Sequence, residues 1–301
     1  MTSSSPLLVV IGATASGKSD LAVELCLRLG GEVVNTDSVQ LYRGMDIGAA
    51  KVTPAERRGV PHHLLDVWDV SVEASVAVFQ TLARAAVADV QGRGAVPVLT
   101  GGSSLYVRAV LDDLDFPGTD PAVRARWLHE LDARGPEALH AELARVAPLA
   151  AEAILPSNGR RIVRALEVTE ITGEPFVATM PAHESVFPDV TMIGLDVPRD
   201  VLDERIEARV HRMWADGLVD EVRRLIEVGL ATSPTASRAL GYQQVLAFLA
   251  GDLTEDDARE QTIRGTKAFA RRQDRLFRKD PRIHWLPFDA PDVVERALAL
   301  V

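Results

Sequence analysis

Residues 7–29 read LLVVIGATASGKSDLAVELCLRL, and the fold class can be predicted from these residues. The apolar run Leu7–Ile11 is rich in β-branched residues, which is typical of a buried parallel strand. A glycine-containing turn follows it. Leu21, Leu25 and Leu29 then recur on one face of a predicted helix. The stretch therefore predicts a strand, a tight turn and a helix in immediate succession.

The turn between this strand and this helix fits the pattern G-x-x-x-x-G-K-[S/T]. Its glycines let successive backbone N–H groups point into one concavity, and the helix N-terminus adds partial positive charge, so such a P-loop binds a chain of phosphates. The lysine adds a full charge, and the serine that follows it can bind Mg²⁺ through its hydroxyl. The predicted phosphate-binding residues are Gly12, Ala13, Thr14, Ala15, Ser16, Gly17, Lys18 and Ser19.

Further strands are predicted at 32–36, 96–100 and 190–197, and a helix is predicted within 72–90. Strands that alternate with helices indicate an α/β fold, here a P-loop NTPase-like parallel sheet flanked by helices. From Val201 onward the pattern is again mostly helical.

The stretch 116–189 shows helical patterns and no strong strand, which predicts a helical insertion domain. Its expected helices cover 122–134, 136–145 and 158–172. The core domain should then comprise 1–115 together with 190–301.

The composition is that of an ordinary globular protein, with 301 residues of which 47% are hydrophobic and 25% charged. The single cysteine, Cys26, excludes a disulfide within the chain and a cysteine-based zinc site, and it reads as a small buried hydrophobe. The apolar run Leu7–Ile11 is too short for a signal peptide or a membrane span. We expect a cytoplasmic protein with no membrane partner.

The net charge of −10 does not by itself favour a nucleic-acid partner. The distribution is uneven, because 264–282 holds eight Lys or Arg residues and only two Asp. Five cations recur there at helical spacing and define one basic stripe. A solvated helix face is the usual origin of such a run, but a polyanion-binding surface is the hypothesis that we favour. The basic stripe consists of Arg264, Lys267, Arg271, Arg275 and Arg278.

A P-loop does not choose a reaction, so kinases, ATPases and transferases that release diphosphate all remain open. An ATPase usually has an apolar strand that ends in Asp, whereas 96–100 is followed by Gly101-Gly102-Ser103. The weaker alternative, Leu64-Leu65-Asp66, reads as a loop. His62 and His63 have no third ligand at a suitable spacing, which favours a structural role over metal binding.

Asp37 follows the second predicted strand, and the carboxyl ends of parallel strands meet at the ligand crevice. Its carboxylate can act there as a general base or as a metal partner through water, or it can merely cap the next segment. Arg205 and Arg209 share a helix face after the fourth strand. They can face a phosphate chain or pair with neighbouring glutamates, and the sequence leaves both readings open.

Several strings resemble the tRNA dimethylallyltransferase (isopentenyltransferase) family over nearly the whole chain. They stand in the family's order and are more specific than a P-loop alone. After the P-loop they are DSVQLYRGMDIGAAK (37–51), PHHLLD (61–66), PVLTGGSSLY (97–106), RRIVRALEV (160–168), LGYQQ (240–244) and ARRQ (270–273).

The resemblance implies transfer of a dimethylallyl group from dimethylallyl diphosphate to N6 of the adenosine 3′ of the anticodon, with Mg²⁺ as cofactor and a monomeric enzyme. It implies that Lys18 and Ser19 stabilise the leaving diphosphate, that Asp37 is the general base and that Ser103 orients the amine. Arg205 and Arg209 are candidates for a further contact to that diphosphate, and the sequence does not show which of the two faces it. The implied contacts to the tRNA anticodon stem-loop are Asp37, Ser38, Val39, Gln40, Ser103, Arg124, Arg160, Arg161, Arg164, Arg238, Gly241, Tyr242, Arg271, Arg272, Gln273, Arg275 and Arg278.

Three other functions compete with this expectation. A small-molecule or nucleotide kinase would hold ATP in the P-loop. A prenyltransferase acting on free adenine nucleotides would need neither the basic segment nor a large insertion. An RNA-binding protein with the P-loop as a nucleotide switch would leave Asp37 and Ser103 without a task.

Overall fold

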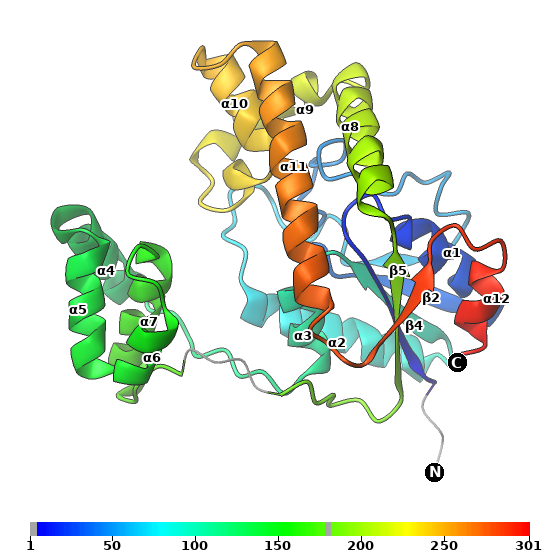
Figure 1. Cartoon of the computed structure of the whole chain (residues 1–301), viewed down its shortest axis with the longest axis horizontal. Helices are drawn as coiled ribbons and strands as arrows, with labels where there is room; N and C mark the ends of the chain where they lie inside the picture. The colour runs from blue at the N-terminus through cyan, green and yellow to red at the C-terminus, as the bar shows by residue number, and fades with distance from the viewer. Residues whose placement is uncertain (1–4, 178–181) are drawn as a thin grey trace. The chain divides into compact units, whose positions relative to one another are not determined.

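A parallel sheet of six strands carries the larger part of the chain in the computed structural model, which describes residues 5–177 and 182–301 (Figure 1). The first four residues of the expected core and 178–181 of the expected insertion lie outside the described residues. The strands are β1 (Leu7–Ile11), β2 (Gly31–Asn35), β3 (His62–His63), β4 (Val96–Gly101), β5 (Val190–Asp196) and β6 (Ile283–Pro287). Their order across the sheet is β3-β2-β4-β1-β5-β6, and all neighbouring pairs are parallel.

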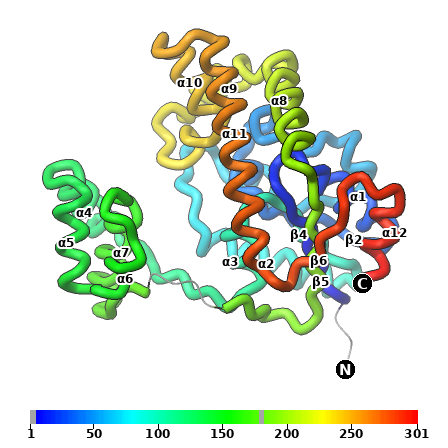
Figure 2. Tube along the Cα trace, in the orientation of Figure 1, coloured from blue at the N-terminus to red at the C-terminus, as the bar shows by residue number. Residues whose placement is uncertain are grey.

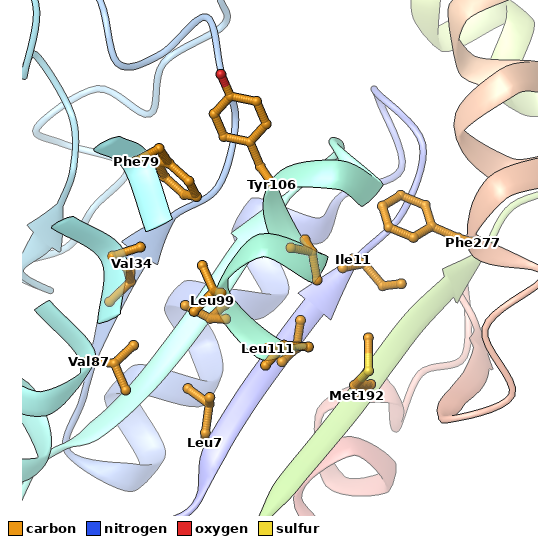
Figure 3. Close-up of a cluster of buried hydrophobic side chains, with 14 of the residues drawn as sticks. Leu7, Ile11, Val34, Phe79, Val87, Leu99, Tyr106, Leu111, Met192 and Phe277 are labelled. Carbon is orange, nitrogen blue, oxygen red and sulfur yellow. The ribbon is translucent and has the colours of Figure 1, made fainter. Parts of the chain in front are cut away.

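Helices cover both faces of the sheet, which explains why β1 is apolar at every position. Leu7, Val9 and Ile11 point to one face and pack against α2 (Val76–Gly92) and α3 (Ser104–Leu111). Figure 3 shows Leu7 and Ile11 in this cluster. Leu8 and Val10 point to the other face, which α1 (Lys18–Leu29) and α12 (Val293–Leu298) cover. The sheet is therefore a doubly wound α/β layer structure, as the sequence predicts.

Strand β1 lies between β4 and β5, with Ile11 paired to Gly101 on one side and to Gly194 on the other. The chain leaves β1 toward one edge of the sheet and reaches β5 on the opposite side. In open α/β sheets, ligands bind outside the carboxyl ends of the strands at such a switch point. The P-loop directly follows β1 and so lies at this position.

Four helices from the second half of the chain form a further layer of the same unit (Figure 2). The long helices α8 and α11 pack against each other, and α9 and α10 close the far end over a core that includes Tyr42 and Met45. Their bounds are α8 Arg199–Ala215, α9 Leu218–Glu227, α10 Tyr242–Ala250 and α11 Glu255–Phe277, with short 3₁₀ turns at Leu230–Thr232 and Ala236–Arg238.

The strand-turn-helix prediction is confirmed, since β1 and α1 begin and end at the predicted residues. The prediction of a helical C-terminal region missed strand β6, and the two-residue β3 was also missed. Tertiary context creates both strands. β6 pairs with β5 from Ile283 to Pro287, and β3 adds His62 and His63 to the edge of β2. Short edge strands of this kind leave little periodicity to read.

The chain divides into two compact units, 1–112 with 185–301 and 113–184. The expected borders lay three and five residues further along the chain. Asp112 forms an antiparallel bridge with Ser185, and the Val186 N–H donates to the Leu111 carbonyl. Because of these contacts, the sheet unit extends to Asp112 and resumes at Ser185.

The second unit consists of helices α4 (Pro121–Arg134), α5 (Pro136–Val146), α6 (Pro148–Ala153) and α7 (Gly159–Thr172), of which α6 was not predicted. Proline at the first helical position starts three of them, because its missing N–H has no intrahelical acceptor there. Leu139, Leu143, Ile162 and Leu166 form its own buried core.

In the described part of the chain, no helix is both long and apolar enough to cross a membrane.

Candidate active site

The P-loop adopts a conformation in which two residues have positive φ. Gly17 lies at φ 95°, where glycine has no steric cost, and Ala15 lies at 67°. A Cβ on Gly12 would stand 2.6 Å from Oγ of Ser16, so the first glycine allows the loop to close on itself. Helix α1 begins at Lys18, and the first N–H groups of a helix have no partner within it. The loop therefore presents backbone donors and a helix N-terminus to an anion.

Gln273 on α11 fastens this loop to the neighbouring strand. The Thr14 N–H donates to Oε1 of Gln273 at 2.9 Å, and Nε2 of Gln273 donates to the Gly102 carbonyl at 2.8 Å. The side chain is buried, and a Cβ on Gly102 would collide with it. The expectation that Gln273 contacts tRNA is therefore wrong for its side chain, whose polar atoms are committed to joining the P-loop to the end of β4.

Two cations lie close together at the P-loop. Burial and the nearby Arg209 guanidinium lower the pKa of Lys18 to about 8, while the Asp37 carboxylate opposes the shift. Burial likewise lowers the pKa of Arg209, and Arg212 adds to that effect. Nη1 of Arg209 donates to Oγ1 of Thr14 at 3.2 Å. Two buried cations that lower each other's pKa form a strongly positive site, and such a site favours the binding of an anion.

A cavity of about 450 Å³ adjoins the P-loop and brings the predicted residues together. Lys18, Ser19, Asp37 and Arg209 all line it. Arg205 does not. Its guanidinium lies 4.4 Å from the centre of the Phe288 ring and lines an adjoining hollow, which shares Gly17 and Arg209 with the cavity. Of the two arginines that the sequence left open, Arg209 is therefore the one that shares a cavity with Lys18.

Asp37 stands at the carboxyl end of β2 and forms a tight turn. Its Oδ1 accepts from the Val39 N–H at 2.9 Å, and its own N–H donates to Oδ1 of Asn35 at 2.9 Å. In the described part of the chain, Oδ2 of Asp37 has no hydrogen-bond partner. One carboxylate oxygen thus shapes the turn, which is the capping role, while the other remains available to a ligand in the cavity.

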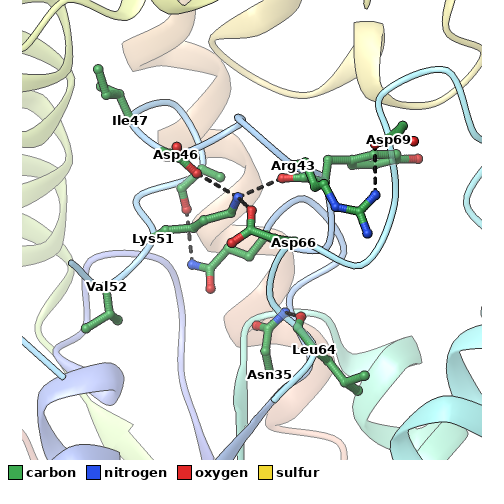
Figure 4. A network of polar contacts seen from close by, with 12 residues as sticks. Asn35, Arg43, Asp46, Ile47, Lys51, Val52, Leu64, Asp66 and Asp69 are labelled. Atoms are coloured by element: carbon green, nitrogen blue, oxygen red, sulfur yellow. Dashed lines mark hydrogen bonds and ion pairs between the residues drawn. The ribbon is translucent and has the colours of Figure 1, made fainter. Parts of the chain in front are cut away.

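The segment that follows Asp37 is held in place by a network of polar contacts that Figure 4 shows. Nζ of Lys51 is almost fully buried and donates to Oδ1 of Asp46 at 2.7 Å, to Oδ1 of Asp66 at 2.5 Å and to the Tyr42 carbonyl at 2.7 Å. Nε2 of Gln40 donates to the carbonyls of Ala49 and Ala50. Lys51 had no predicted role beyond its place in a family string. Nothing in a single sequence shows that one ammonium joins three loop segments.

The last of the predicted catalytic residues, Ser103, lies at the beginning of a helix. Ser103 is the N-cap residue of α3, yet its hydroxyl makes no capping bond and has no hydrogen-bond partner among residues 5–177 and 182–301. No cluster of three or more His, Cys, Asp or Glu side chains able to hold a metal occurs in the described residues. Mg²⁺ commonly binds through one or two protein oxygens and substrate phosphates. The Ser19 hydroxyl and Oδ2 of Asp37 fit such a shared site.

The predicted basic stripe lies on α11 and just beyond it, but ion pairs neutralise much of it. Arg264 pairs with Glu260, Lys267 with Glu207, and Arg278 with Asp274 and Asp196 while it stacks on Trp285. Arg278, one of the four arginines expected to lead the tRNA contact, therefore offers less free charge than the other three, and its contact with tRNA stays a prediction. Three exposed arginines have no acidic partner among the described residues, namely Arg271, Arg272 and Arg275.

Tyr242 and Gly241 are not surface residues. The Tyr242 side chain is completely buried, and its hydroxyl donates to Oε1 of Glu221 at 2.6 Å, so the expected tRNA contact is wrong. Gly241 has φ 89° and begins α10, with its N–H bound to Oε1 of Gln244. Of the other residues expected to bind tRNA, Ser38 and Val39 lie partly exposed in the loop after Asp37, and Arg238 is exposed.

In the helical unit, the expected tRNA-binding arginines differ in their surroundings. Arg124 and Arg164 both pair with the buried carboxylate of Glu167, at 3.6 and 3.1 Å. Arg164 also donates to the carbonyls of Pro117 and Gly118. These two arginines therefore have a structural task. Arg160 and Arg161 are exposed on α7.

Both histidines of β3 have hydrogen-bond partners within the protein, although His62 also lines the P-loop cavity. Nε2 of His63 lies 2.5 Å from Oε2 of Glu32, and Nδ1 of His62 lies 2.9 Å from the Val60 carbonyl. Cys26 is buried in α1, as expected.

The lowered pKa of Lys18 predicts a pH dependence of anion binding. Above pH 8 the free protein loses the Lys18 proton, so binding must take a proton up, and the Kd for inorganic diphosphate should rise by up to about tenfold per pH unit. Below pH 7 this group should contribute no slope. Calorimetric titration from pH 6.5 to 9.5 measures the profile. Lys18→Arg is the matched control, because arginine does not titrate there, and an identical slope in that variant would contradict the assignment.

Comparisons with known proteins show the family of this chain. The family model described as IPP transferase matches residues 40–280. The tRNA dimethylallyltransferase of Thermobifida fusca is 64% identical over 302 residues, which cover 99% of this chain and 94% of the relative. The tRNA dimethylallyltransferase of Streptomyces avermitilis is also 64% identical, over 96% of this chain and 92% of the relative.

Solved structures with the same fold exist. The full-length tRNA isopentenylpyrophosphate transferase of Bacillus halodurans superposes with a TM-score of 0.71 at 38% identity, over 98% of this chain and 93% of that chain. A eukaryotic dimethylallyltransferase acting on tRNA superposes with a TM-score of 0.79 at 24% identity, over 99% of this chain and 78% of that chain, a likeness of fold alone.

Proposed function

The chain belongs to the IPP transferase family, and from that membership we propose that its P-loop cavity binds the diphosphate of dimethylallyl diphosphate and there transfers the dimethylallyl group to tRNA. The chain is a transferase that prenylates tRNA, and N6 of the adenosine next to the anticodon is the acceptor in the family's reaction. The proposal concerns which residues of this chain do the work.

One observation carries the proposal. Lys18 and Arg209 lie at one P-loop with lowered pKa values, and both line the cavity that also contains the Asp37 carboxylate. The negative charge of a diphosphate would stabilise the charged forms of Lys18 and Arg209. As the allylic C–O bond breaks, charge grows on the diphosphate, and fixed donors stabilise that charge without reorganising.

Asp37 lies on the same cavity and has the right chemistry for the acceptor. The exocyclic amine of adenine is a weak nucleophile, because its lone pair is delocalised into the ring. Loss of an amine proton to Oδ2 of Asp37 would accompany formation of the new C–N bond. The free hydroxyl of Ser103 could orient the same amine. An anticodon-loop adenine must leave its stack to reach any such pocket.

Mg²⁺ would be held by the Ser19 hydroxyl and by Asp37, directly or through water, and when bound it would supply further neutralisation of the leaving diphosphate. Because the substrate is tRNA, we propose that the enzyme acts in the cytoplasm. We also propose that it acts as a monomer.

A labelled-substrate assay tests the function. The protein is incubated with tRNA and either labelled dimethylallyl diphosphate or ATP labelled on its γ-phosphate. Label from the prenyl donor should enter the tRNA, and label from ATP should not enter it. Transfer from ATP with none from the prenyl donor would instead support a kinase. Transfer to free adenine nucleotides in preference to tRNA would support the smaller prenyltransferase alternative.

The three unpaired arginines of α11 are the proposed tRNA contact of the sheet unit. Each phosphate contact that is lost should lower the slope of log affinity against log salt by a little under one unit. Arg271→Ala combined with Arg275→Ala should therefore weaken tRNA binding and flatten its salt dependence, with dimethylallyl diphosphate affinity nearly unchanged. Filter binding or fluorescence anisotropy at several salt concentrations measures both quantities.

A control with the same change of net charge separates a local contact from long-range charge. Arg28 and Arg296 are exposed and lie on α1 and α12. Screening over about 8 Å at physiological salt makes distant charges ineffective, so the pair Arg28→Ala and Arg296→Ala should leave the slope unchanged. If Arg271→Ala with Arg275→Ala has the same slope of log tRNA affinity against log salt as the wild type, the contact does not lie on α11. It should then be sought on the helical unit, starting with Arg160 and Arg161.

A further inference from the structure

Glu221 on α9 is a buried carboxylate that binds a loop rather than a cation. Its Oε2 accepts from the N–H groups of Asp46 at 3.1 Å and Ile47 at 2.7 Å, and its Oε1 accepts from the Gly48 N–H at 3.2 Å. The residue is only 2% exposed. Among the described residues, no Lys, Arg or His pairs with it. Three successive backbone N–H groups therefore offset the cost of burying its charge.

Tyr242 on α10 completes this contact from the other side. Its hydroxyl donates to Oε1 of Glu221 at 2.6 Å. Burial, and then the Glu221 carboxylate, raise the pKa of Tyr242 well above its ordinary value, so the phenol remains a donor. Its ring also occupies the space in which a side chain at position 48 would lie. A Cβ on Gly48 would stand 2.6 Å from the ring, which explains the glycine in this loop.

The loop that Glu221 holds is a wall of the P-loop cavity. Asp46, Ile47, Ala49 and Ala50 line the same cavity as Lys18 and Asp37, whereas Glu221 and Tyr242 do not. The Asp46 side chain in turn binds Lys51, which ties this wall to the next loop. The position of this wall therefore depends on Glu221 and Tyr242, which contact the loop but do not line the cavity.

We propose that Glu221 and Tyr242 are positioning residues that fix segment 46–48 as a wall of the prenyl diphosphate site. The inference rests on the proposed function. A carboxylate can accept from all three N–H groups and from the phenol at once. An amide has one acceptor oxygen and would turn its NH₂ toward N–H donors, so its attraction for the loop is lost although its shape is the same.

Glu221→Gln is the main test, with Glu227→Gln as its matched control on the same helix, where residue 227 is exposed. Two readouts need no turnover. Amide exchange of the peptide that contains 46–48 should become at least about tenfold faster in Glu221→Gln, the size expected for loss of a hydrogen bond to a charged group. The Kd for inorganic diphosphate with Mg²⁺ should rise by about tenfold or more.

Steady-state kinetics separates positioning from a general loss of folded protein. The KM for dimethylallyl diphosphate should rise by about tenfold while kcat changes by less than about threefold, so saturating prenyl donor restores turnover. A purely structural role would lower the melting temperature and kcat and leave the KM unchanged. Tyr242→Phe keeps the ring and loses one of four hydrogen bonds, so its effect should have the same pattern and be smaller.

Gly48→Ala disturbs the contact from the loop side and serves if Glu221→Gln does not fold. Its new methyl group must displace either the loop or the Tyr242 ring, so it should reproduce the rise in KM and in Kd. The proposed function itself fails if the wild type does not bind diphosphate. The positioning role alone fails under a different result. In that case the wild type binds diphosphate, but folded Glu221→Gln or folded Gly48→Ala has the same amide-exchange rate at 46–48, the same Kd for diphosphate and the same KM for dimethylallyl diphosphate as the wild type.

Discussion

Lys18→Ala is expected to abolish transfer of the dimethylallyl group. The ammonium is the one full charge that the P-loop itself contributes, and losing a fixed donor to a developing anion typically costs a factor of roughly a hundred to a thousand in turnover. Here the lost donor also carries a full charge, so the loss should reach at least the upper end of that range. Ser19→Ala should be inactive too, since its hydroxyl is the proposed Mg²⁺ ligand. Single-turnover transfer to tRNA measures both.

Stability and ligand binding show whether Lys18 acts on the substrate. Burial lowers the pKa of Lys18, so its charge is a cost to the folded protein, and its removal should not decrease the free energy of unfolding near pH 7. Diphosphate should no longer raise the melting temperature of the variant. Lys279→Ala, at an exposed lysine, is the control and should retain that shift. Full turnover in purified Lys18→Ala would remove the P-loop from the mechanism.

Asp37→Asn is expected to reduce turnover by roughly a hundredfold or more, the usual effect of losing a general base. Asparagine keeps an Oδ1 that can accept from the Val39 N–H, so the turn after β2 should persist. What the substitution removes is the basicity of the second oxygen. The affinity for tRNA should therefore stay within a few fold. Rapid-quench measurement of the transfer step, with tRNA affinity determined in parallel, separates these effects.

Two checks keep this result interpretable. The Asp37 carboxylate raises the pKa of Lys18, so Asp37→Asn should lower that pKa further. The diphosphate affinities of the variant and the wild type must therefore be compared at one pH below about 7, where Lys18 carries its proton. Asp37→Ala loses the turn as well and should have a lower melting temperature, which Asp37→Asn should not have. Nearly normal turnover in Asp37→Asn would show that Asp37 only shapes the turn and that the base lies elsewhere.

Local signals sufficed for the parts of the molecule that depend on neighbouring residues. The P-loop, β1 and α1 follow from one stretch, because buried parallel strands need continuous apolar runs and phosphate turns need glycine at set positions. Helices α4, α5 and α7 of the insertion follow from periodicity, whereas the six-residue α6 does not. The position of Asp37 beside the P-loop follows from the rule that strand ends meet. The family strings selected among reactions that a P-loop leaves open.

The tertiary structure decided which polar groups have partners, because such partners come from distant parts of the chain. Gln273 and Tyr242 resemble surface residues in a family string, yet one binds the P-loop some 259 positions earlier and the other binds Glu221. Arg278 belongs to a basic stripe by spacing, but it forms an ion pair with Asp196 at the end of strand β5. Arg209 rather than Arg205 shares the Lys18 cavity, since one turn of α8 separates facing the P-loop from facing Phe288. Charge and spacing along a chain predict a surface, whereas only packing determines which charges remain free to bind.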